Sequence, residues 1–282
     1  MSPRRPAWRN SVHGVTDIDR YGPWAVIAGA SEGIGEHAAR QLAADGMSLV
    51  LVSRRPAALD TLRESILAED AAPDVEVRVV ALDLATDDAA ARLCAEIDAL
   101  DVGLLFYNAG ADATATAFLD RAADDVLGMV RCNVVTATAL CHAIGRRMRD
   151  RGRGGIVVIS SGAAIAGAAL IATYSATKAY QQILCEGLWA ELDGTGVDVV
   201  CVMAGTTATP AFLRTTAMTA DDPAVMAPAD VARNALAALG HGPVVGASDE
   251  LTEMFAGLST VPRTMLIEGV SAGTRATFGL HG

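Results

Sequence analysis

The stretch WAVIAGASEGIG, residues 24–35, decides the fold of this chain. Its first five residues are apolar and short enough for a buried β-strand, and a helical pattern runs on through Leu42 to Asp45. A strand, a glycine-rich turn and a helix in this order bring backbone N–H groups and a helix N-terminus to a pyrophosphate. The GxxxGxG spacing differs from the commoner GxGxxG, and a lone turn of this kind also fits a tight βα connection. The stretch therefore favours an α/β domain that begins at a dinucleotide-binding turn.

The same alternation of strands and helices continues along the chain. Short apolar runs typical of strands lie at 48–52, 75–81, 102–107, 155–160 and 197–202, with an edge strand at 244–245. Helical patterns lie at 120–151, 174–193 and 228–239. Since no repeat or linker interrupts them, the sequence predicts one doubly wound parallel sheet with helices on both faces. We expect an N-terminal arm at 1–20 and a single domain at 21–282, with a substrate loop at about 206–227 and a C-terminal segment at 248–282.

The bulk composition argues against several functions. Hydrophobic residues make up 51% of the 282, enough for a large core, and the net charge of −11 disfavours a nucleic-acid surface. The longest apolar run, 162–172, is too short to span a bilayer, and residues 1–20 lack the apolar segment of a signal peptide. The five cysteines form no CxxC motif and no Cys/His cluster. We therefore expect a cytoplasmic protein with reduced cysteines, no metal site and no transmembrane segment.

Residues 174–178 read Tyr-Ser-Ala-Thr-Lys, and Lys178 is the only lysine in a chain with 22 Lys and Arg residues in total. On a helix, the four-residue spacing places the side chains of Tyr174 and Lys178 on one face. A cation beside a phenol stabilises the phenolate and lowers its pKa, and a lysine ammonium also has three donors for sugar hydroxyls. The alternative is an ordinary surface lysine. The pair predicts a tyrosine acid or base supported by Lys178.

The end of the second strand indicates which dinucleotide is bound. An acid at this position accepts a hydrogen bond from a ribose 2′-OH, whereas a basic residue suits a 2′-phosphate. Here Ser53 is followed by Arg54 and Arg55, which favours NADP(H) over NAD(H). Two arginines at a strand end are also common as solvated charge, and Glu32 in the glycine-rich turn could repel the same phosphate.

Polar residues follow the third and fourth strands and interrupt the helix after them. Asp83 could bond an adenine amine or cap a helix near Thr86. The small residues of Asn108-Ala109-Gly110 let a cofactor approach the backbone closely. Asn133 lies in the middle of the 120–151 helical pattern, where it is either a satisfied core polar residue or a functional one.

Taken together, these residues resemble the short-chain dehydrogenase/reductase family. The match runs in order from Gly29 to about Thr209, and the gap of 13 residues between Ser161 and Tyr174 is usual in that family. The resemblance implies a Rossmann-type sheet of seven parallel strands in the order 3-2-1-4-5-6-7, with three helices on each face. It also implies a homodimer or homotetramer, which agrees with apolar residues on more than one face of the predicted helices, among them Leu184, Leu188 and Trp189.

The resemblance also implies roles for the site residues. Tyr174 would be the acid or base, Ser161 would polarise the same substrate oxygen, and Lys178 would lower the pKa of Tyr174 and hold the nicotinamide ribose. Asn133 would shape its helix so that a water connects Lys178 to solvent as a proton relay. The implied cofactor-binding residues are Gly29, Ser31, Gly33, Ile34, Gly35, Arg54, Asp83, Leu84, Asn108, Ala109, Gly110, Tyr174, Lys178, Gly205 and Thr207.

The chain departs from the family pattern at three points. Ala28 replaces a usual Thr, Tyr107 stands where Asn often precedes Asn-Ala-Gly, and Ala204-Gly205 replaces Pro-Gly. The first change loses a hydroxyl hydrogen bond near the turn. The third softens a corner that would help to place the nicotinamide.

Two functions remain open from the sequence. The favoured one is an NADP-dependent oxidoreductase acting on a carbonyl or alcohol. Its substrate would be apolar, because 162–171 beside Ser161 carries no charge, although this run could also simply pack a loop on the core. The start at 20–24 also looks like family members acting on steroids and acyl chains. The alternative is a catalytically idle nucleotide-binding regulator or scaffold, which would have no reason to keep its only lysine at position 178.

Overall fold

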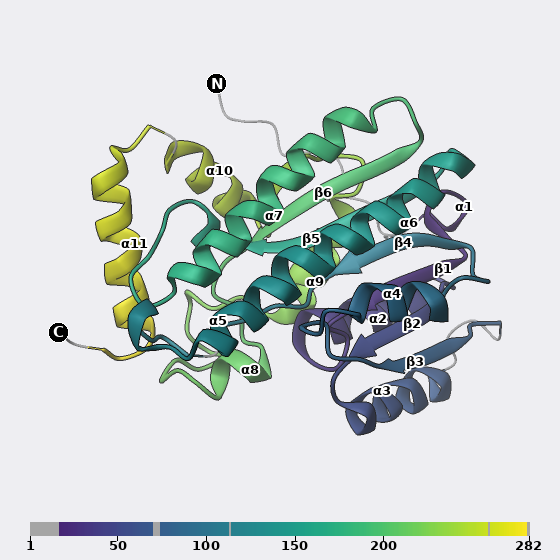
Figure 1. The fold of residues 1–282 in the computed structure, drawn as a ribbon, viewed down its shortest axis with the longest axis horizontal. Helices are drawn as coiled ribbons and strands as arrows, with labels where there is room; N and C mark the ends of the chain where they lie inside the picture. The colour runs from purple at the N-terminus through teal and green to yellow at the C-terminus, as the bar shows by residue number, and fades with distance from the viewer. Residues whose placement is uncertain (1–16, 70–73, 113, 259, 281–282) are drawn as a thin grey trace.

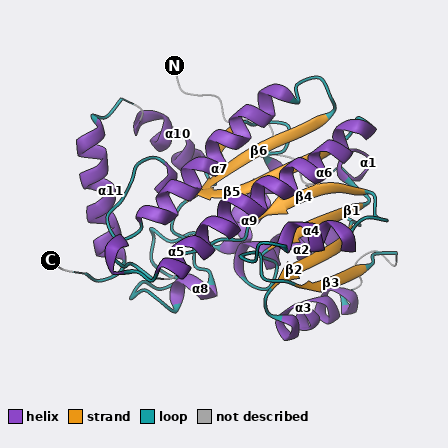
Figure 2. Cartoon of the chain, in the orientation of Figure 1, coloured by secondary structure: helices purple, strands orange, loops and turns teal. Residues whose placement is uncertain are grey.

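A central sheet of seven parallel strands lies between layers of helices (Figure 2). The structure is a computed structural model and describes residues 17–69, 74–112, 114–258 and 260–280. The sheet order is β3-β2-β1-β4-β5-β6-β7, which confirms the predicted Rossmann-type topology. The strands are β1 (Trp24–Ala28), β2 (Ser48–Ser53), β3 (Val77–Ala81), β4 (Val102–Tyr107), β5 (Gly154–Ser161), β6 (Val197–Ala204) and β7 (Val244–Gly246).

Most of the helices lie between consecutive strands and return the chain to the start of the next strand. They are α1 (Ile18–Tyr21), α2 (Gly33–Ala44), α3 (Pro56–Ala68), α4 (Ala89–Glu96), α5 (Ala123–Val130), α6 (Ala137–Arg151), α7 (Ala172–Glu191), α8 (Pro210–Leu213), α9 (Pro228–Ala237), α10 (Asp249–Leu258) and α11 (Arg263–Thr277). Shorter irregular helices are the 3-10 segments η2 (Phe118–Asp120) and η4 (Gly162–Ala164) and the π-helical segment η3 (Arg131–Thr136).

The two faces of the sheet form two separate apolar cores. In β1, Ala25 and Ile27 pack in the core that contains the buried residues of α2, α3 and α9. The alternate residues Trp24, Val26 and Ala28 pack in the core that contains those of α4, α6 and α7. A strand covered on both faces needs a continuous apolar run, which explains the pattern of 24–28. Three helices on each face agree with the expectation from the sequence.

The start of the domain is tied to the sixth strand. Asp198 accepts a hydrogen bond from the hydroxyl of Tyr21 at 2.5 Å and forms an ion pair with Arg20 at 2.6 Å. Both partners belong to or flank α1, so this helix is fixed against the sheet. Most of the predicted N-terminal arm, residues 1–16, lies outside the described residues.

The predicted helix at 120–151 is correct in place but wrong in detail. It begins at Ala123, and its middle at Arg131–Thr136 is π-helical between α5 and α6. The whole run Ala123–Arg151 would be long and apolar enough to cross a membrane, a test that core helices of soluble proteins also pass. Here α6 packs against β4 and β5, and α5 packs against α7.

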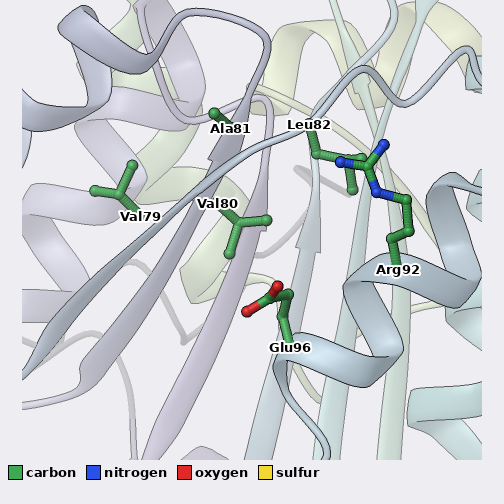
Figure 3. A pocket seen from close by; sticks show the side chains of 6 residues that line it. All are labelled: Val79, Val80, Ala81, Leu82, Arg92 and Glu96. Atoms are coloured by element: carbon green, nitrogen blue, oxygen red, sulfur yellow. The ribbon is translucent and has the colours of Figure 1, made fainter.

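The parallel strands all point the same way, so their carboxyl ends share one edge of the sheet. In Figure 1, α8, α10 and α11 lie at that end of the molecule. The candidate site residues follow these strand ends. A separate hollow between β3 and α4 contains none of the candidate catalytic residues (Figure 3); it is lined by Val79, Val80, Ala81, Leu82, Arg92 and Glu96.

Candidate active site

The glycine-rich turn between β1 and α2 has a backbone that only glycine accommodates easily. Gly29 and Gly33 have φ angles of +88° and +63°. A Cβ on Gly35 would lie 2.1 Å from the carbonyl oxygen of Gly29, so the chain passes itself too closely for a side chain. Asn108 Nδ2 donates a hydrogen bond to the same carbonyl at 3.1 Å, which ties the end of β4 to the turn. The buried Ile34 anchors the first turn of α2 in the core.

Gly110 and Asn133 are in direct contact. Gly110 has a φ of +107°, and a Cβ there would lie 1.8 Å from Asn133 Oδ1. Asn133 is fully buried, and its Nδ2 donates to Thr177 Oγ1 of α7 at 2.9 Å. Its Oδ1 has no hydrogen-bond partner within the described part of the chain. The small residues after β4 therefore make room for Asn133.

Two side chains from other elements bond to backbone carbonyls of the π-helical segment η3. The Tyr107 hydroxyl donates to the carbonyl of Cys132 at 2.5 Å, and Gln181 Nε2 donates to the carbonyl of Asn133 at 2.9 Å. These two carbonyls of the widened helical turn therefore accept donors from outside the helix. Tyr107, a departure from the family pattern, thus supports the segment that carries Asn133.

The predicted catalytic pair lies on one face of α7. Lys178 is 2% exposed, and its Nζ lies 5.7 Å from the ring centroid of Tyr174. The ammonium donates to the carbonyl of Ile159 at 2.8 Å and to Oε1 of Gln181 at 3.1 Å. The hydroxyl of Ser160 donates to the carbonyl of Lys178 at 2.9 Å, so β5 and α7 are joined at this point.

The pKa of Tyr174 is raised, not lowered as the sequence analysis expected. Burial is the main cause, the charge of Asp112 adds to it, and a hydrogen bond with Ser161 opposes it. Burial lowers the pKa of Lys178 to about 8. The ammonium of Lys178 donates its hydrogen bonds to Ile159 and Gln181. Its charge does not offset the effect of burial on the pKa of Tyr174. Tyr174 is consequently protonated at neutral pH, the form in which it can donate a proton.

Glu32 is neutralised by two arginines, which corrects the expectation of a repulsive exposed acid. Its carboxylate accepts from Arg55 Nη1 at 2.8 Å and from Arg214 Nη2 at 2.9 Å. Burial alone would raise the pKa of Glu32, but the bonds to Arg214 and Arg55 outweigh it and lower the pKa. Arg55 also donates to Ser31 Oγ at 2.8 Å, while Arg54 is exposed.

Two charged residues, Arg54 after β2 and Asp83 after β3, act on the same thiol as Lys178. Burial raises the pKa of the Cys132 thiol in η3, Lys178 and Arg54 lower it, and Asp83 raises it. Arg54, Asp83 and Lys178 are therefore electrostatic neighbours of one thiol. Asp83 Oδ1 accepts from the backbone N–H of Ala85 at 2.9 Å.

The loops after β3 and β6 differ in part from the sequence-based expectations. The suggestion that Asp83 caps a helix starting near Thr86 is wrong, because α4 begins at Ala89 after Asp88. Leu84 is buried, and its carbonyl accepts from Thr136 at 2.9 Å. After β6, Thr207 donates to the carbonyl of Gly205 at 2.9 Å, which closes the turn that lacks the usual proline.

The C-terminal helices cover the apolar run beside Ser161. A Cβ on Gly162 would lie 3.2 Å from the ring of Phe255 in α10. From α11, Arg263 donates to the carbonyl of Ile165 at 2.6 Å. Ser271 Oγ accepts from the N–H of Ala169 at 3.0 Å. The C-terminal segment therefore forms one wall of the region next to Ser161.

A charged pair beside the site was missed by the sequence analysis. Asp112 and Arg121 form an ion pair at 3.0 Å, with side chains only 4% and 7% exposed. The field of Asp112 reaches Tyr174. The run 162–171 carries no charge, but the loop after Gly110 does. Arg214 and Gln181 were missed as well, although Gln181 follows Tyr174 by seven residues and so shares its helix face.

Comparison with known proteins identifies the family. The family model described as short chain dehydrogenase matches residues 23–220. The chain belongs to this family. It is therefore an oxidoreductase of a family that uses nicotinamide cofactors, and the resemblance drawn from the motifs is confirmed.

Individual family members agree with this assignment. The chain is 35% identical over 227 residues to the 7beta-hydroxysteroid dehydrogenase of Clostridium sardiniense, which covers 79% of this chain and 84% of that protein. It is 35% identical to the very-long-chain 3-oxoacyl-CoA reductase of Neurospora crassa, but there it covers 72% of this chain and only 60% of that protein.

Solved structures of family members share the fold over most of the chain. A structure of a 7beta-hydroxysteroid dehydrogenase superposes with a TM-score of 0.82 at 28% identity, over 89% of this chain and 97% of that one. A short-chain dehydrogenase from Sphingobium yanoikuyae in complex with NADPH gives a TM-score of 0.75 at 27% identity, over 87% and 95%.

Proposed function

We propose that this protein is an NADP(H)-dependent oxidoreductase that interconverts a carbonyl and a secondary alcohol on an apolar substrate. The observation that carries the proposal is the position of Tyr174, which shares a hydrogen bond with Ser161 and has its ring centroid 5.7 Å from Lys178 Nζ. All three lie at the carboxyl end of the sheet, as does the glycine-rich turn. The turn fits a dinucleotide, because its glycines keep side chains off a backbone that leads directly into the N-terminus of α2. When bound, the cofactor supplies or takes up the hydride.

The side chains of the site perform the proton chemistry. In reduction, the protonated hydroxyl of Tyr174 donates its proton to the carbonyl oxygen as negative charge develops there. The hydroxyl of Ser161 donates a hydrogen bond to the same oxygen and stabilises that charge. Lys178 holds a positive charge near Tyr174, which favours the phenolate formed once the proton has left. In oxidation the same groups act in the reverse direction.

The choice of NADP(H) over NAD(H) is supported by the arginines at the end of β2. Arg54 is exposed and free to meet a 2′-phosphate, and a charged hydrogen bond of this kind contributes about 1.5–3 kcal/mol. Glu32 does not oppose it, because Arg55 and Arg214 neutralise its charge. The NADPH complex of the Sphingobium yanoikuyae relative agrees with this choice.

Removing Arg54 is expected to change cofactor preference. Arg54→Ala should weaken NADPH binding by about tenfold and leave NADH binding nearly unchanged, because only NADPH carries the 2′-phosphate. Titration of both cofactors into the wild type and the variant measures this. Arg63→Ala is the matched control, since Arg63 pairs with Asp60 on the surface of α3. Equal losses for both cofactors would show that Arg54 acts on the fold or the pyrophosphate, and tighter NADH binding in the wild type would contradict the cofactor proposal.

An apolar substrate is supported by the wall beside Ser161. The uncharged run 162–171 is covered by Phe255 and α11, so a charged group placed against it would lose its hydration without a partner. The names of the relatives point in the same direction, since they specify a hydroxysteroid and a very-long-chain 3-oxoacyl group. The alternative function is a catalytically idle nucleotide-binding regulator or scaffold. NADPH consumption against a panel of steroid, acyl and polycyclic ketones separates the two.

We also propose that the protein forms a homodimer through α7 and the neighbouring segments α5 and η3. Ile183 of α7 is 63% exposed, Leu127 of α5 is 48% exposed and Val135 of η3 is 53% exposed. Trp189, 45% exposed, lies further along α7. Leu188, which the sequence suggested for such an apolar face, packs against the core. An exposed apolar face across packed helices favours burial against a second copy. Sedimentation velocity at micromolar concentration should show a dimer or a larger assembly, and a monomer would count against the proposal.

A further inference from the structure

A buried hydrogen-bond bridge joins Lys178 to the helical segment that carries Asn133. Gln181 is 1% exposed and lies three residues after Lys178 on α7. Its Oε1 accepts from Lys178 Nζ at 3.1 Å, and its Nε2 donates to the backbone carbonyl of Asn133 at 2.9 Å. A single side-chain amide therefore spans the distance between the ammonium and η3.

The bridge restricts what the ammonium can do. An ammonium has three N–H donors, and the Ile159 carbonyl takes one of them at 2.8 Å while Gln181 takes a second. One N–H donor is left for a ribose hydroxyl or for a contact with Tyr174. Holding two of three donors fixes the orientation of the group before any ligand binds, which is the condition for precise positioning.

The same bridge provides polar contacts that the buried charge needs. The titratable side chains acting on Lys178 are Cys132 of η3, Cys201 of β6 and Tyr174 on its own helix, and none of these is a carboxylate. A buried ammonium without a counter-ion depends on hydrogen-bond acceptors. Gln181 and the Ile159 carbonyl are the two acceptors that the structure shows.

We propose that Gln181 is a positioning residue of the reaction, which keeps the ammonium of Lys178 charged and oriented and ties it to the segment that carries Asn133. The inference rests on the proposed function, in which Lys178 supports the proton donor Tyr174. An amide accepts and donates hydrogen bonds but does not pass on a proton. Gln181 therefore orients Lys178 and is not itself a link in a proton relay.

The unique lysine allows a direct test that does not depend on activity. Lysine labelled with ¹³C at Cε gives one side-chain signal, whose chemical shift against pH reports the ionisation of Lys178. Gln181→Leu should lower the pKa of Lys178, because it removes an acceptor from the ammonium, and Gln181→Glu should raise it, because it adds a carboxylate. Gln182→Leu is the matched control, since Gln182 bonds to Glu186 and should leave the titration unchanged.

Turnover tests the positioning role itself. Gln181→Leu should lower kcat by about tenfold and raise the KM for NADPH by a smaller factor, because the misplaced ammonium disturbs the reacting geometry more than its single remaining contact with the ribose. If Gln181→Leu does not fold, the isosteric Gln181→Glu variant still tests the titration. Titrations that match the wild type in both variants would overturn the proposal, as would shifted titrations with unchanged kcat. A wild type that titrates as expected but turns over no carbonyl substrate would instead contradict the proposed function.

Discussion

Tyr174→Phe is expected to abolish most of the turnover while leaving NADPH binding largely intact. The substitution removes only the hydroxyl that donates the proton, and a positioned acid contributes about 10²–10⁴-fold to a rate. The ring remains, so the packing of α7 should be preserved. Steady-state reduction of the best ketone substrate and a parallel NADPH titration measure the two effects.

Tyr180→Phe is the control for this experiment. Tyr180 lies on the same helix, is 40% exposed, and shares a hydrogen bond with Thr138 at 2.9 Å. Loss of the Tyr180 hydroxyl should leave turnover close to the wild-type value. Activity of Tyr174→Phe within about tenfold of wild type, ~1.4 kcal/mol of barrier, would exclude Tyr174 as the acid.

Lys178→Arg should lose about 10²-fold in turnover even though the positive charge is kept. The ammonium is 2% exposed and is held between Ile159 and Gln181, where a planar, larger guanidinium cannot reproduce the same hydrogen bonds. Turnover and NADPH affinity should both fall, because Lys178 is also the proposed ribose ligand.

Folding must be separated from chemistry for this variant. Overpacking a core usually costs about 1–3 kcal/mol, so the melting temperature is measured beside the kinetics. Lys178→Met, which has a similar length and no charge, should be folded and inactive. A folded Lys178→Arg protein with full activity would mean that a buried positive charge is sufficient and that the ammonium geometry is unimportant.

The elements of the fold could be predicted because they depend on local patterns. The apolar run at 24–28 and the glycines after it are sufficient to place β1, the turn and α2, and the observed strand bounds agree within about two residues. The π-helical segment around Asn133 could not be predicted in the same way. It depends on Tyr107 and Gln181, which lie 25 and 48 residues from the carbonyls they contact.

The electrostatics of the site were the least predictable part. The sequence shows Glu32 in the turn, but Arg214 reaches it from a loop 182 residues away. The pKa of Tyr174 is raised because burial outweighs the other contributions, and burial is a property of the folded chain. Gln181 is the exception, because its seven-residue offset from Tyr174 already places it on the face of the helix that carries the proposed catalytic pair.

Transfer of deuterium from cofactor to product tests the central claim most directly. NADPH carrying two deuterium atoms at C4 is incubated with the wild-type protein and a ketone that it consumes, and the alcohol is examined by mass spectrometry. We expect one deuterium on the carbinol carbon of the product in the wild type, and formation of the same product at least about 10²-fold more slowly with Tyr174→Phe. Failure of every ketone and aldehyde tested to give a labelled alcohol, with a protein that binds NADPH, would contradict the account and favour the idle nucleotide-binding alternative.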